Sequence, residues 1–354
     1  MRFSICIPNY NYARYLGRTI QSVLDQTYQD FEIVVCDNCS TDESANVVRG
    51  FGDARIKLNI NACNVGFAGN LDRAARMATG DVMIMLSSDD LMRPQALETY
   101  ANLYAVLGDE APRTVLSSSP EVIDSDDSLT GRIEPEPLVW KPTDARDDLG
   151  KVVDGTVYGV PIRELHKRCL LSMKTPFFFA CTAYPRKLYE EVEGYGGGRL
   201  INPDKWFSWK LLSVADAGYF VDLPLFAYRV HASNQNSLQA AQGALKFMVD
   251  EYVSSFEVDK GVLEKLSLTR EDLEQAFVEH DVARHGLATL ARGERQKARR
   301  VLAFGRAVYP WHVRRNRKAR ILGMLLSLGP IGGAMARLAY NSYQQRSNGE
   351  QESE

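Results

Sequence analysis

Two adjacent carboxylates, Asp89 and Asp90, follow an uncharged apolar segment at 82–86. That segment predicts a buried strand, and ligands of an open α/β sheet bind outside the carboxyl ends of its strands. Carboxylate oxygens in this position are suitable ligands for Mg²⁺ or Mn²⁺ carrying a phosphorylated substrate. An Asp-Asp turn followed by a helix that begins near Pro94 would explain the same residues. The pair alone leaves both interpretations open.

The composition is that of a soluble globular protein, with 45% hydrophobic and 25% charged residues in a chain of 354. This length allows two domains, or one large α/β domain with an appendage. Residues 1–5 lead directly into a strand pattern and lack the regions of a secretory signal peptide. The six cysteines have no disulfide-framework spacing, and the pair Cys36 and Cys39 has no second pair to complete a zinc site. We therefore expect a cytoplasmic protein with reduced thiols.

Short apolar segments alternate with amphipathic ones along the first third of the chain. This alternation predicts strands joined by helices and hence a largely parallel sheet. Ser40 and Glu43 have the spacing of a capping box for the second helix. The expected strands are 3–7, 31–36, 55–59, 82–86 and 114–118, and the expected helices are 13–26, a segment ending near 51, 68–78 and 94–107.

The segment 120–150 interrupts the alternation. It is acidic, contains four prolines and has no hydrophobic period, so it predicts a surface loop or insertion. Regular structure is expected again in a helix over 204–216 and a short strand over 219–221. Beyond residue 236 the patterns are helical only, with a helical hairpin over 283–309 that is broken at Gly293.

A series of motifs follows these elements in order. The first two strands lie in S-I-C-I-P-N-Y-N-Y-A-R-Y-L and in S-V-L-D-Q-T-Y-Q-D-F-E-I-V-V-C-D-N-C-S-T-D. Further along come N-V-G-F-A-G-N, A-T-G-D and S-S-D-D-L-M-R-P, and then P-D-K-W-F-S-W-K and P-L-F-A-Y-R-V-H. Over residues 3–235 this series resembles family 2 glycosyltransferases, which have the GT-A nucleotide-sugar fold.

The resemblance implies an α/β fold of the GT-A type, with a Rossmann-like, mainly parallel sheet and flanking helices. Residues 1–235 would form the catalytic domain, with a nucleotide-binding half at about 1–119 and an acceptor half at about 151–235. Residues 236–354 would form an α-helical C-terminal region that includes a basic and apolar segment at 311–340.

The resemblance also implies a set of donor-binding residues. Pro8 and Tyr10 would line the nucleotide base, while Asp37 or Asn38 would accept the imide N–H of uracil or thymine. Asp37 and Asn38 could also be turn residues that bond their own backbone. Loop geometry alone would explain Asn64, Gly66 and Asn70. The implied nucleotide-sugar-binding residues are Pro8, Tyr10, Asp37, Asn38, Asn64, Gly66, Asn70, Ser88, Asp89 and Arg229.

By the same resemblance, Mg²⁺ or Mn²⁺ is the expected cofactor. Asp90 would be its main ligand, and Asp89 would contact either the metal or the ribose. Arg229 and His231 resemble a pair that closes over the diphosphate, with the His231 imidazole as a further metal ligand. The commonest family pattern has an acid at position 87, where this chain has Ser87.

Asp204 is the implied catalytic base. It follows Pro203 at the start of an expected helix, where the helix dipole should keep its carboxylate ionised. Family members usually have an acid immediately before this residue. An ordinary acidic residue in the first turn of a helix would also explain Asp204.

These features predict an inverting glycosyltransferase that moves a sugar from a UDP- or dTDP-sugar to a hydroxyl of a glycan or polyprenyl-linked acceptor. Bacterial surface polysaccharide synthesis is the implied pathway, and nucleic acid is not an expected partner. A sugar nucleotidyltransferase is the enzymatic alternative, but it should have a Gly-rich basic loop where this chain has 8–12. A catalytically degenerate scaffold is the second alternative, and only Ser87 supports it.

Charge is distributed unevenly along the chain. Between Arg292 and Arg320 the sequence contains eleven Lys or Arg and one acid, Glu294. The segment 109–148, in contrast, contains eleven acids and four bases. The uncharged segment 321–336 follows the basic run but is too short for a spanning helix, which needs about 20 apolar residues. We therefore expect 311–340 to lie on the inner face of the cytoplasmic membrane. The alternative is a helical hairpin that packs on the catalytic domain.

Overall fold

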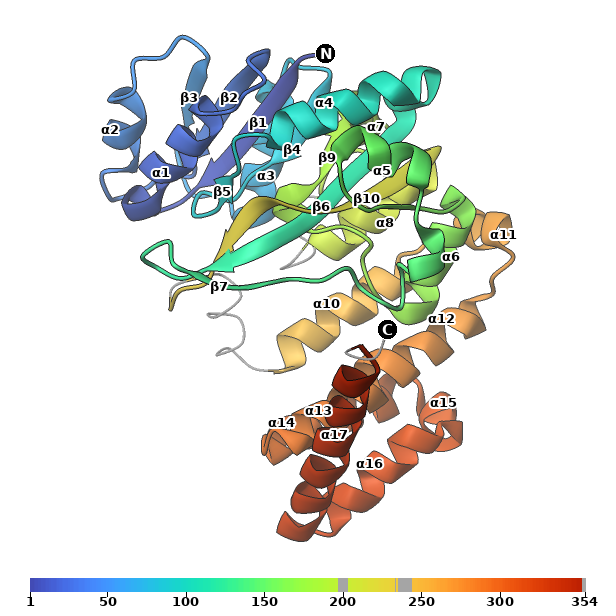
Figure 1. Cartoon of the computed structure of the whole chain (residues 1–354). Helices are drawn as coiled ribbons and strands as arrows, with labels where there is room; N and C mark the ends of the chain where they lie inside the picture. Colours follow the sequence, from blue (N-terminus) through green and yellow to red (C-terminus); the bar gives the residue numbers. More distant parts are fainter. Residues whose placement is uncertain (197–202, 233, 235–243, 352–354) are drawn as a thin grey trace. The chain divides into compact units, whose positions relative to one another are not determined.

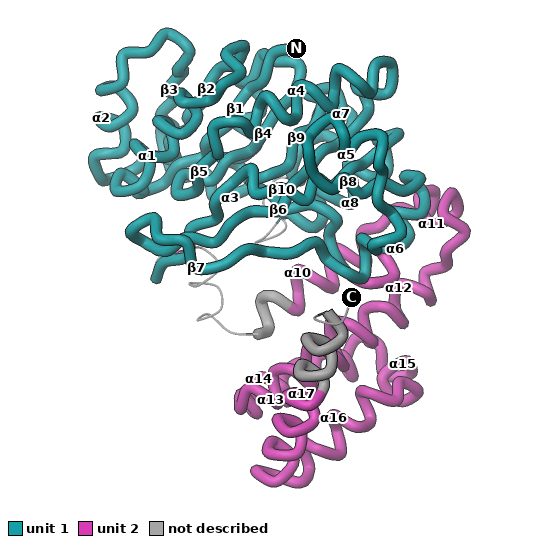
Figure 2. Tube along the Cα trace, viewed as in Figure 1, with its two compact units in different colours: residues 1–169, 174–232 teal, residues 170–173, 233–354 magenta. Residues whose placement is uncertain are grey.

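The computed structural model describes the whole chain except residues 197–202, 233, 235–243 and 352–354. The chain divides into two compact units (Figure 2). The first contains Met1–Cys169 and Lys174–Ala232, and the second contains Leu170–Met173 and Ser233–Glu354. Each unit is described by itself below.

The first unit is built on a ten-stranded sheet with the order β3-β2-β1-β4-β9-β6-β10-β5, to which β7 and β8 pair at the side (Figure 1). Pairing is parallel from β3 to β4 and between the long strands β6 and β10. The strands are β1 (Phe3–Asn9), β2 (Phe31–Asp37), β3 (Ile56–Ile60), β4 (Val82–Met85), β5 (Leu91–Met92), β6 (Thr114–Ile123), β7 (Leu129–Arg132), β8 (Val157–Gly159), β9 (Ala183–Pro185) and β10 (Ala217–Arg229). The predicted α/β class with a mainly parallel sheet and flanking helices is confirmed.

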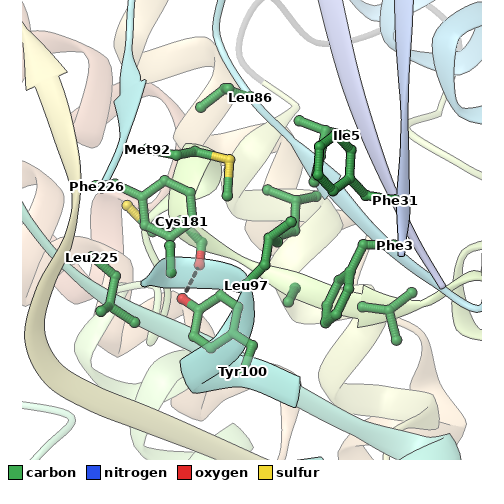
Figure 3. Close-up of a cluster of buried hydrophobic side chains, with 14 of the residues drawn as sticks. Phe3, Ile5, Phe31, Leu86, Met92, Leu97, Tyr100, Cys181, Leu225 and Phe226 are labelled. Atoms are coloured by element: carbon green, nitrogen blue, oxygen red, sulfur yellow. Dashed lines mark hydrogen bonds between the residues drawn. The ribbon is translucent and has the colours of Figure 1, made fainter. Parts of the chain in front are cut away.

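Helices cover both faces of this sheet, which explains why β1 and β2 are buried along their whole length. Phe3 and Ile5 point into one core together with α1 and α4 (Figure 3). The alternating residue Cys6 points to the opposite face, where its thiol contacts the Ala74 carbonyl of α3. The helices are α1 (Ala13–Leu24), α2 (Ser44–Arg49), α3 (Phe67–Met77), α4 (Ala96–Leu107), α5 (Asp147–Val153), α6 (Ile162–Ser172), α7 (Arg186–Glu191) and α8 (Asp204–Val214).

The strand predicted over 219–221 is only part of β10, which runs for 13 residues. Pro224 interrupts the hydrophobic pattern, but it lies where the register with β6 shifts. A bulge tolerates proline because the ladder hydrogen bond is already broken there. The strand predicted over 114–118 is likewise longer, because β6 continues through Pro120 to Ile123.

The segment 120–150, predicted to be a surface loop or insertion, has regular structure. It contains β7, a 3-10 turn and the start of the helix α5. Its structure depends on isolated contacts: the buried Trp140 indole donates to the Pro176 carbonyl at 2.9 Å, and Asp144 forms an ion pair with Arg168. Single anchors of this kind leave no hydrophobic period in the sequence.

The capping box predicted at Ser40 and Glu43 is also wrong. Helix α2 begins at Ser44 without a side-chain cap, and the Ser40 hydroxyl donates to Asp37 instead. Asp42 accepts from the Ser44 backbone N–H at 3.1 Å and from the Ala13 N–H at 2.9 Å. The Asp42 carboxylate therefore connects the first residues of α1 and α2, in place of the expected capping box.

The second unit is helical throughout its described part. Its helices are α10 (Ala244–Phe256), α11 (Lys260–Leu266), α12 (Arg270–Phe277), α13 (His285–Ala291), α14 (Arg295–Val308), α15 (Pro310–Arg315), α16 (Arg317–Ser327) and α17 (Pro330–Gln351), and a π-helical turn, Val278–Arg284, joins α12 to α13. The predicted break at Gly293 separates α13 from α14, and its φ of 89° favours glycine. In the described ranges, no helix is long and apolar enough to cross a membrane.

Glu32 joins the amino ends of β1 and β2 to the turn before β4. Its buried carboxylate accepts from the Ser4 hydroxyl and the Thr79 backbone N–H at 2.6 Å each, and it forms an ion pair with Lys57 at 2.6 Å. Burial raises the pKa of Glu32, but these hydrogen bonds outweigh burial and lower the pKa to about 2. The ionised carboxylate therefore stabilises the fold.

We predict that Glu32→Gln lowers the free energy of unfolding at pH 7 by about 1–3 kcal/mol, because it removes bonds to a buried charge. The pKa in the folded state lies below its ordinary value of 4.5, so the stabilisation is complete above that pH and is lost as the pH falls toward 2. Urea unfolding across this pH range measures both effects. Glu98→Gln, which changes an exposed carboxylate, is the control. Equal losses in the two variants would contradict the prediction.

Candidate active site

The two carboxylates lie in a turn after β4, which we call the aspartate turn (residues 87–90). It leads into the short strand β5, which pairs antiparallel with β10. Helix α4 begins only at Ala96, so Pro94 lies before the helix rather than in its first turn. The Ser88 carbonyl accepts from the Thr19 hydroxyl of α1 at 3.0 Å, which fixes the turn from the other side. Asp89 and Asp90 are both buried.

Arg229, at the end of β10, holds the aspartate turn. Its backbone N–H donates to Asp90 Oδ1 at 2.9 Å, and its Nε donates to the Asp89 carbonyl at 2.7 Å. The side chain is fully buried, with its guanidinium 4.9 Å from the centre of the Tyr15 ring. The Arg229 side chain is therefore held among groups of the protein itself.

The same guanidinium reaches the turn between β6 and β7. It donates to the Asp124 carbonyl at 2.9 Å and forms an ion pair with Asp127. Asp127 also pairs with Arg18 of α1. Sequence reasoning missed this acidic turn because it lies in the segment that was expected to be a loop. Its only signal was the cluster of acids directly after a strand.

His231 lies beside Asp89. Its Nε2 is 3.0 Å from Asp89 Oδ2, and its ring lies 4.7 Å from Tyr15 and 5.7 Å from Tyr12 between centroids. Burial raises the pKa of Asp89, and the contact with His231 partly offsets this rise. Burial and the charge of Asp89 raise the pKa of Asp90 well above its ordinary range.

The aspartate turn suits a divalent cation that a substrate helps to hold. Asp90 Oδ2 is buried and has no hydrogen-bond partner in the described part of the chain. Within those same residues, no three His, Cys, Asp or Glu side chains form a complete cation site. Mg²⁺ is commonly bound by one or two carboxylates together with substrate phosphates, so a protein cage is not required. The donor set therefore fits a cation that binds with a diphosphate.

Asp37 and Asn38, at the end of β2, differ in how many of their hydrogen-bonding groups the protein itself uses. The Asn38 amide nitrogen donates to Asn64 Oδ1 at 2.9 Å and to the Gly66 carbonyl at 3.3 Å. Its oxygen accepts from Asn61 at 3.1 Å and from the Val65 N–H at 2.9 Å. A side-chain amide has two N–H donors and two acceptor sites, so Asn38 has no capacity left.

Asp37 keeps some acceptor capacity. Its Oδ1 accepts from Asn9 at 2.7 Å and from the Ser40 hydroxyl at 2.6 Å, while Oδ2 accepts only the Ser40 N–H among the described groups. Nearby, Pro8 is buried in β1, whereas the Tyr10 side chain is 44% exposed. Tyr10 therefore offers an open aromatic face beside the end of β1.

A network of asparagine side chains fixes the loops below this turn. Asn61 donates to Asn70 Oδ1 at 2.9 Å, and Asn70 donates to the Cys36 carbonyl at 2.9 Å. Gly66 begins α3 with a φ of 79°, which favours glycine. Sequence reasoning named Asn64, Gly66 and Asn70 but missed Asn61, whose only signal was its position directly after β3.

Asp204 is the first residue of α8. Its Oδ1 is buried and has no hydrogen-bond partner in the described ranges. We expected the helix dipole to keep this carboxylate ionised. Burial raises its pKa to about 6, because desolvation outweighs the favourable backbone groups at the helix start. The side chain is still ~90% ionised at pH 7.

These features define a class of protein. The sheet order, the buried acidic turn after β4 and the helical region that follows are those of a nucleotide-sugar transferase fold of the GT-A type. Residues 4–167 match the family described as Glycosyl transferase family 2.

Several curated relatives are similar to the chain. The uncharacterized glycosyltransferase alr2836 of Nostoc sp. is 29% identical over 292 residues, which cover 76% of this chain and 80% of the relative. The Escherichia coli enzyme WfgD, a UDP-Glc:alpha-D-GlcNAc-diphosphoundecaprenol beta-1,3-glucosyltransferase, is 40% identical over 95 residues, covering 27% of this chain and 38% of WfgD. The chain thus spans well under half of WfgD.

Solved structures share the fold. S. aureus TarS residues 1–349 in complex with UDP-GlcNAc has a TM-score of 0.62 at 18% identity, covering 98% of this chain and 92% of that chain. The mannosyltransferase PcManGT from Pyrobaculum calidifontis, in complex with GDP-Man and Mn²⁺, has a TM-score of 0.52 at 18% identity, covering 95% and 87%. At this level of identity the likeness concerns the fold alone.

We predict that Arg229→Met lowers the free energy of unfolding by about 3–5 kcal/mol, because it leaves Asp127 and the aspartate turn without their buried cation. Arg18→Met is the matched control, since Arg18 pairs with the same Asp127 carboxylate but is 59% exposed. An exposed ion pair contributes about 0–1 kcal/mol. Urea unfolding of both variants tests the difference. Losses of the same size would contradict the prediction, because the contacts of Arg229 would then contribute no more than an exposed ion pair.

Proposed function

We propose that this chain is an inverting glycosyltransferase that transfers a sugar from a UDP- or dTDP-sugar to a hydroxyl group. The observation that carries the proposal is the buried aspartate turn, with its unpartnered Asp90 oxygen, at the carboxyl end of a strand in a family 2 fold. The names of relatives support a glycan or polyprenyl-linked acceptor, because WfgD acts on a diphosphoundecaprenol-linked sugar. Synthesis of bacterial surface polysaccharide at the cytoplasmic face of the membrane is the corresponding pathway.

Asp90 and Asp89 would hold Mg²⁺ or Mn²⁺, with His231 next to Asp89 as a further ligand. When bound, the cation would stabilise the negative charge that grows on the departing nucleoside diphosphate. The complex of PcManGT with GDP-Man and Mn²⁺ supports this choice of metal. Arg229 would keep both carboxylates in position through its hydrogen bonds to the aspartate turn.

On the donor side, Tyr10 would stack on the nucleotide base with its exposed ring. Asp37 is the better candidate for accepting the imide N–H of the base, because the Asn38 amide is fully used by the protein. Asn64, Gly66 and Asn70 would shape the loop below the donor, and Ser88 would contribute through the aspartate turn.

Asp204 would act as the catalytic base. Its carboxylate would take the proton of the acceptor hydroxyl while that oxygen attacks the anomeric carbon and the bond to the diphosphate oxygen breaks. A single displacement of this kind inverts the anomeric centre. A pKa of about 6 suits the role, because the group is ionised at neutral pH and yet more basic than an ordinary aspartate.

The turn after β1 argues against the nucleotidyltransferase alternative. Asn11 adopts a φ of 59° there and accepts from the Thr41 N–H at 2.8 Å. The turn 8–12 contains neither glycine nor a basic side chain. It is therefore built to contact the next loop of the protein rather than to surround a triphosphate.

We predict that Asp90→Asn and Asp204→Asn each lower kcat for sugar transfer by about 10²–10⁴-fold, the range for loss of a charge-stabilising or proton-accepting group. Only Asp90→Asn should also weaken the binding of Mn²⁺ in the presence of UDP. Asp126→Asn, in an exposed carboxylate, is the control. Transfer assays with a panel of nucleotide sugars, with and without chelator, provide the measurement. Normal activity of both variants would refute the mechanism.

The pH dependence offers a separate test of Asp204. Transfer should fall as the pH drops through about 6, because the base must be ionised and burial raises its pKa to that value. Since its folded pKa lies above the ordinary 3.8, ionised Asp204 costs stability once the pH exceeds both values. Asp204→Asn should therefore be at least as stable as the wild type at pH 8. A less stable variant would show that Asp204 has a structural role.

A further inference from the structure

The last two described helices carry apolar residues that the unit does not bury. Ile321, Met324 and Leu328 follow one another at helical spacing along α16 and its end, and Ile331, Met335 and Leu338 do so along α17. These six side chains are between 37% and 70% exposed. We call them the apolar stripes of α16 and α17.

The opposite faces of the two helices supply the packing of the unit. Leu322, Leu325 and Leu326 of α16 are buried, and so is Ala336 of α17. The start of α17 lies so close to α16 that a Cβ on Gly332 would stand 1.9 Å from the Leu325 carbonyl oxygen. The helix pair is therefore already fixed by its inner faces, and the fold of the unit does not use the apolar stripes.

Positive charge surrounds these stripes. Residues 295–349 contain twelve Lys or Arg and no Asp or Glu. Arg317 precedes Ile321 by four residues and so lies on the same face of α16. In the part of the chain that the structure describes, Arg314, Arg315, Arg317 and Arg320 are exposed and form no ion pair with an acid.

Trp311 adds an anchoring side chain next to this charge. Its ring is 58% exposed, and the Arg315 guanidinium lies 4.5 Å from the ring centre. Aromatic side chains with one apolar face and one polar edge favour the boundary between lipid headgroups and acyl chains. Trp311 and the arginines before α16 therefore form a second group of side chains that suits this boundary.

We propose that the apolar stripes, with Trp311 and the arginines beside them, dock on a membrane that contains anionic lipids. The stripes lie in the interface and the arginines bind headgroup phosphates. Charge complementarity decides for this occupant, because the sequence 295–349 contains twelve cations and no acid. Glu274 and Glu279, from an earlier part of the unit, pair with His312 and Lys318, whereas the exposed arginines named above have no acidic partner among the described residues. No described helix is able to span the bilayer, so the contact is peripheral. The inference is independent of the sugar-transfer proposal.

The experiment is co-sedimentation of the full chain with phosphatidylcholine vesicles prepared with and without phosphatidylglycerol. We expect binding to the anionic vesicles only, and its loss at high salt. The double variant Met324→Glu/Leu338→Glu should weaken binding by at least about tenfold, because it places charge in both stripes. Arg317→Gln/Arg320→Gln should weaken it by about 30-fold, as expected for the loss of two cations near an anionic surface.

Matched controls come from the first unit. Val106→Glu changes an apolar residue that is 59% exposed, and Arg49→Gln changes an exposed arginine. Both should bind vesicles like the wild type. Circular dichroism and urea unfolding verify that every variant is folded.

Three results would overturn the proposal. The first is equal binding to neutral and anionic vesicles. The second is wild-type binding by both double variants. The third is absence of vesicle binding together with a concentration-dependent dimer that the stripe variant abolishes, since a second copy would then be the occupant.

Discussion

Repulsion between two adjacent buried carboxylates is the constraint on which the arrangement of the first unit depends. Asp89 and Asp90 lie next to each other in a region of low dielectric, where burial raises the pKa of both and the charge of Asp89 raises that of Asp90 further. Arg229 compensates part of this charge through its backbone N–H and its guanidinium. Strand β5 consists of two residues only, and its pairing with β10 brings Arg229 to the turn. Strand β10 is thus long enough to pair with β5 and to bring Arg229 to Asp90.

Neutral side chains join the loops that follow β2 and β3. Asn38, Asn61 and Asn70 join the ends of β2 and β3 to the start of α3 through amide hydrogen bonds. Amides orient these loops without adding charge of either sign, so they neither repel a diphosphate nor compete with a cation for it. Because each amide bonds to the next, the position of one loop depends on the others. The network gives these loops rigidity, while the aspartate turn carries charge.

The sequence predicted what depends on local patterns and missed what depends on distant partners. Strands β1, β2 and β4 were predictable because uninterrupted apolar runs are typical of buried parallel strands. The position of Asp89 and Asp90 followed from the end of such a run. Their partner His231 lies 142 residues from Asp89 and was found only through its motif.

Long-range contacts also explain the errors. The fold of 120–150 depends on single contacts such as that of Trp140 with Pro176, and a search for periodicity does not detect single contacts. The raised pKa of Asp204 was missed for the same reason, since the burial of its Oδ1 is a property of the packed chain.

The effect of Ser87 on the aspartate turn depends on the charges around it. A third carboxylate at position 87 would add negative charge beside Asp90, whose pKa is already raised by burial and by Asp89. The Ser87 hydroxyl does the opposite, because its hydrogen bond to the carboxylate acts to lower the pKa of Asp90. A serine therefore favours the ionised form of Asp90, which is the form that binds a cation. The departure from the common family pattern is consistent with a working aspartate turn, and it gives no support to a degenerate site.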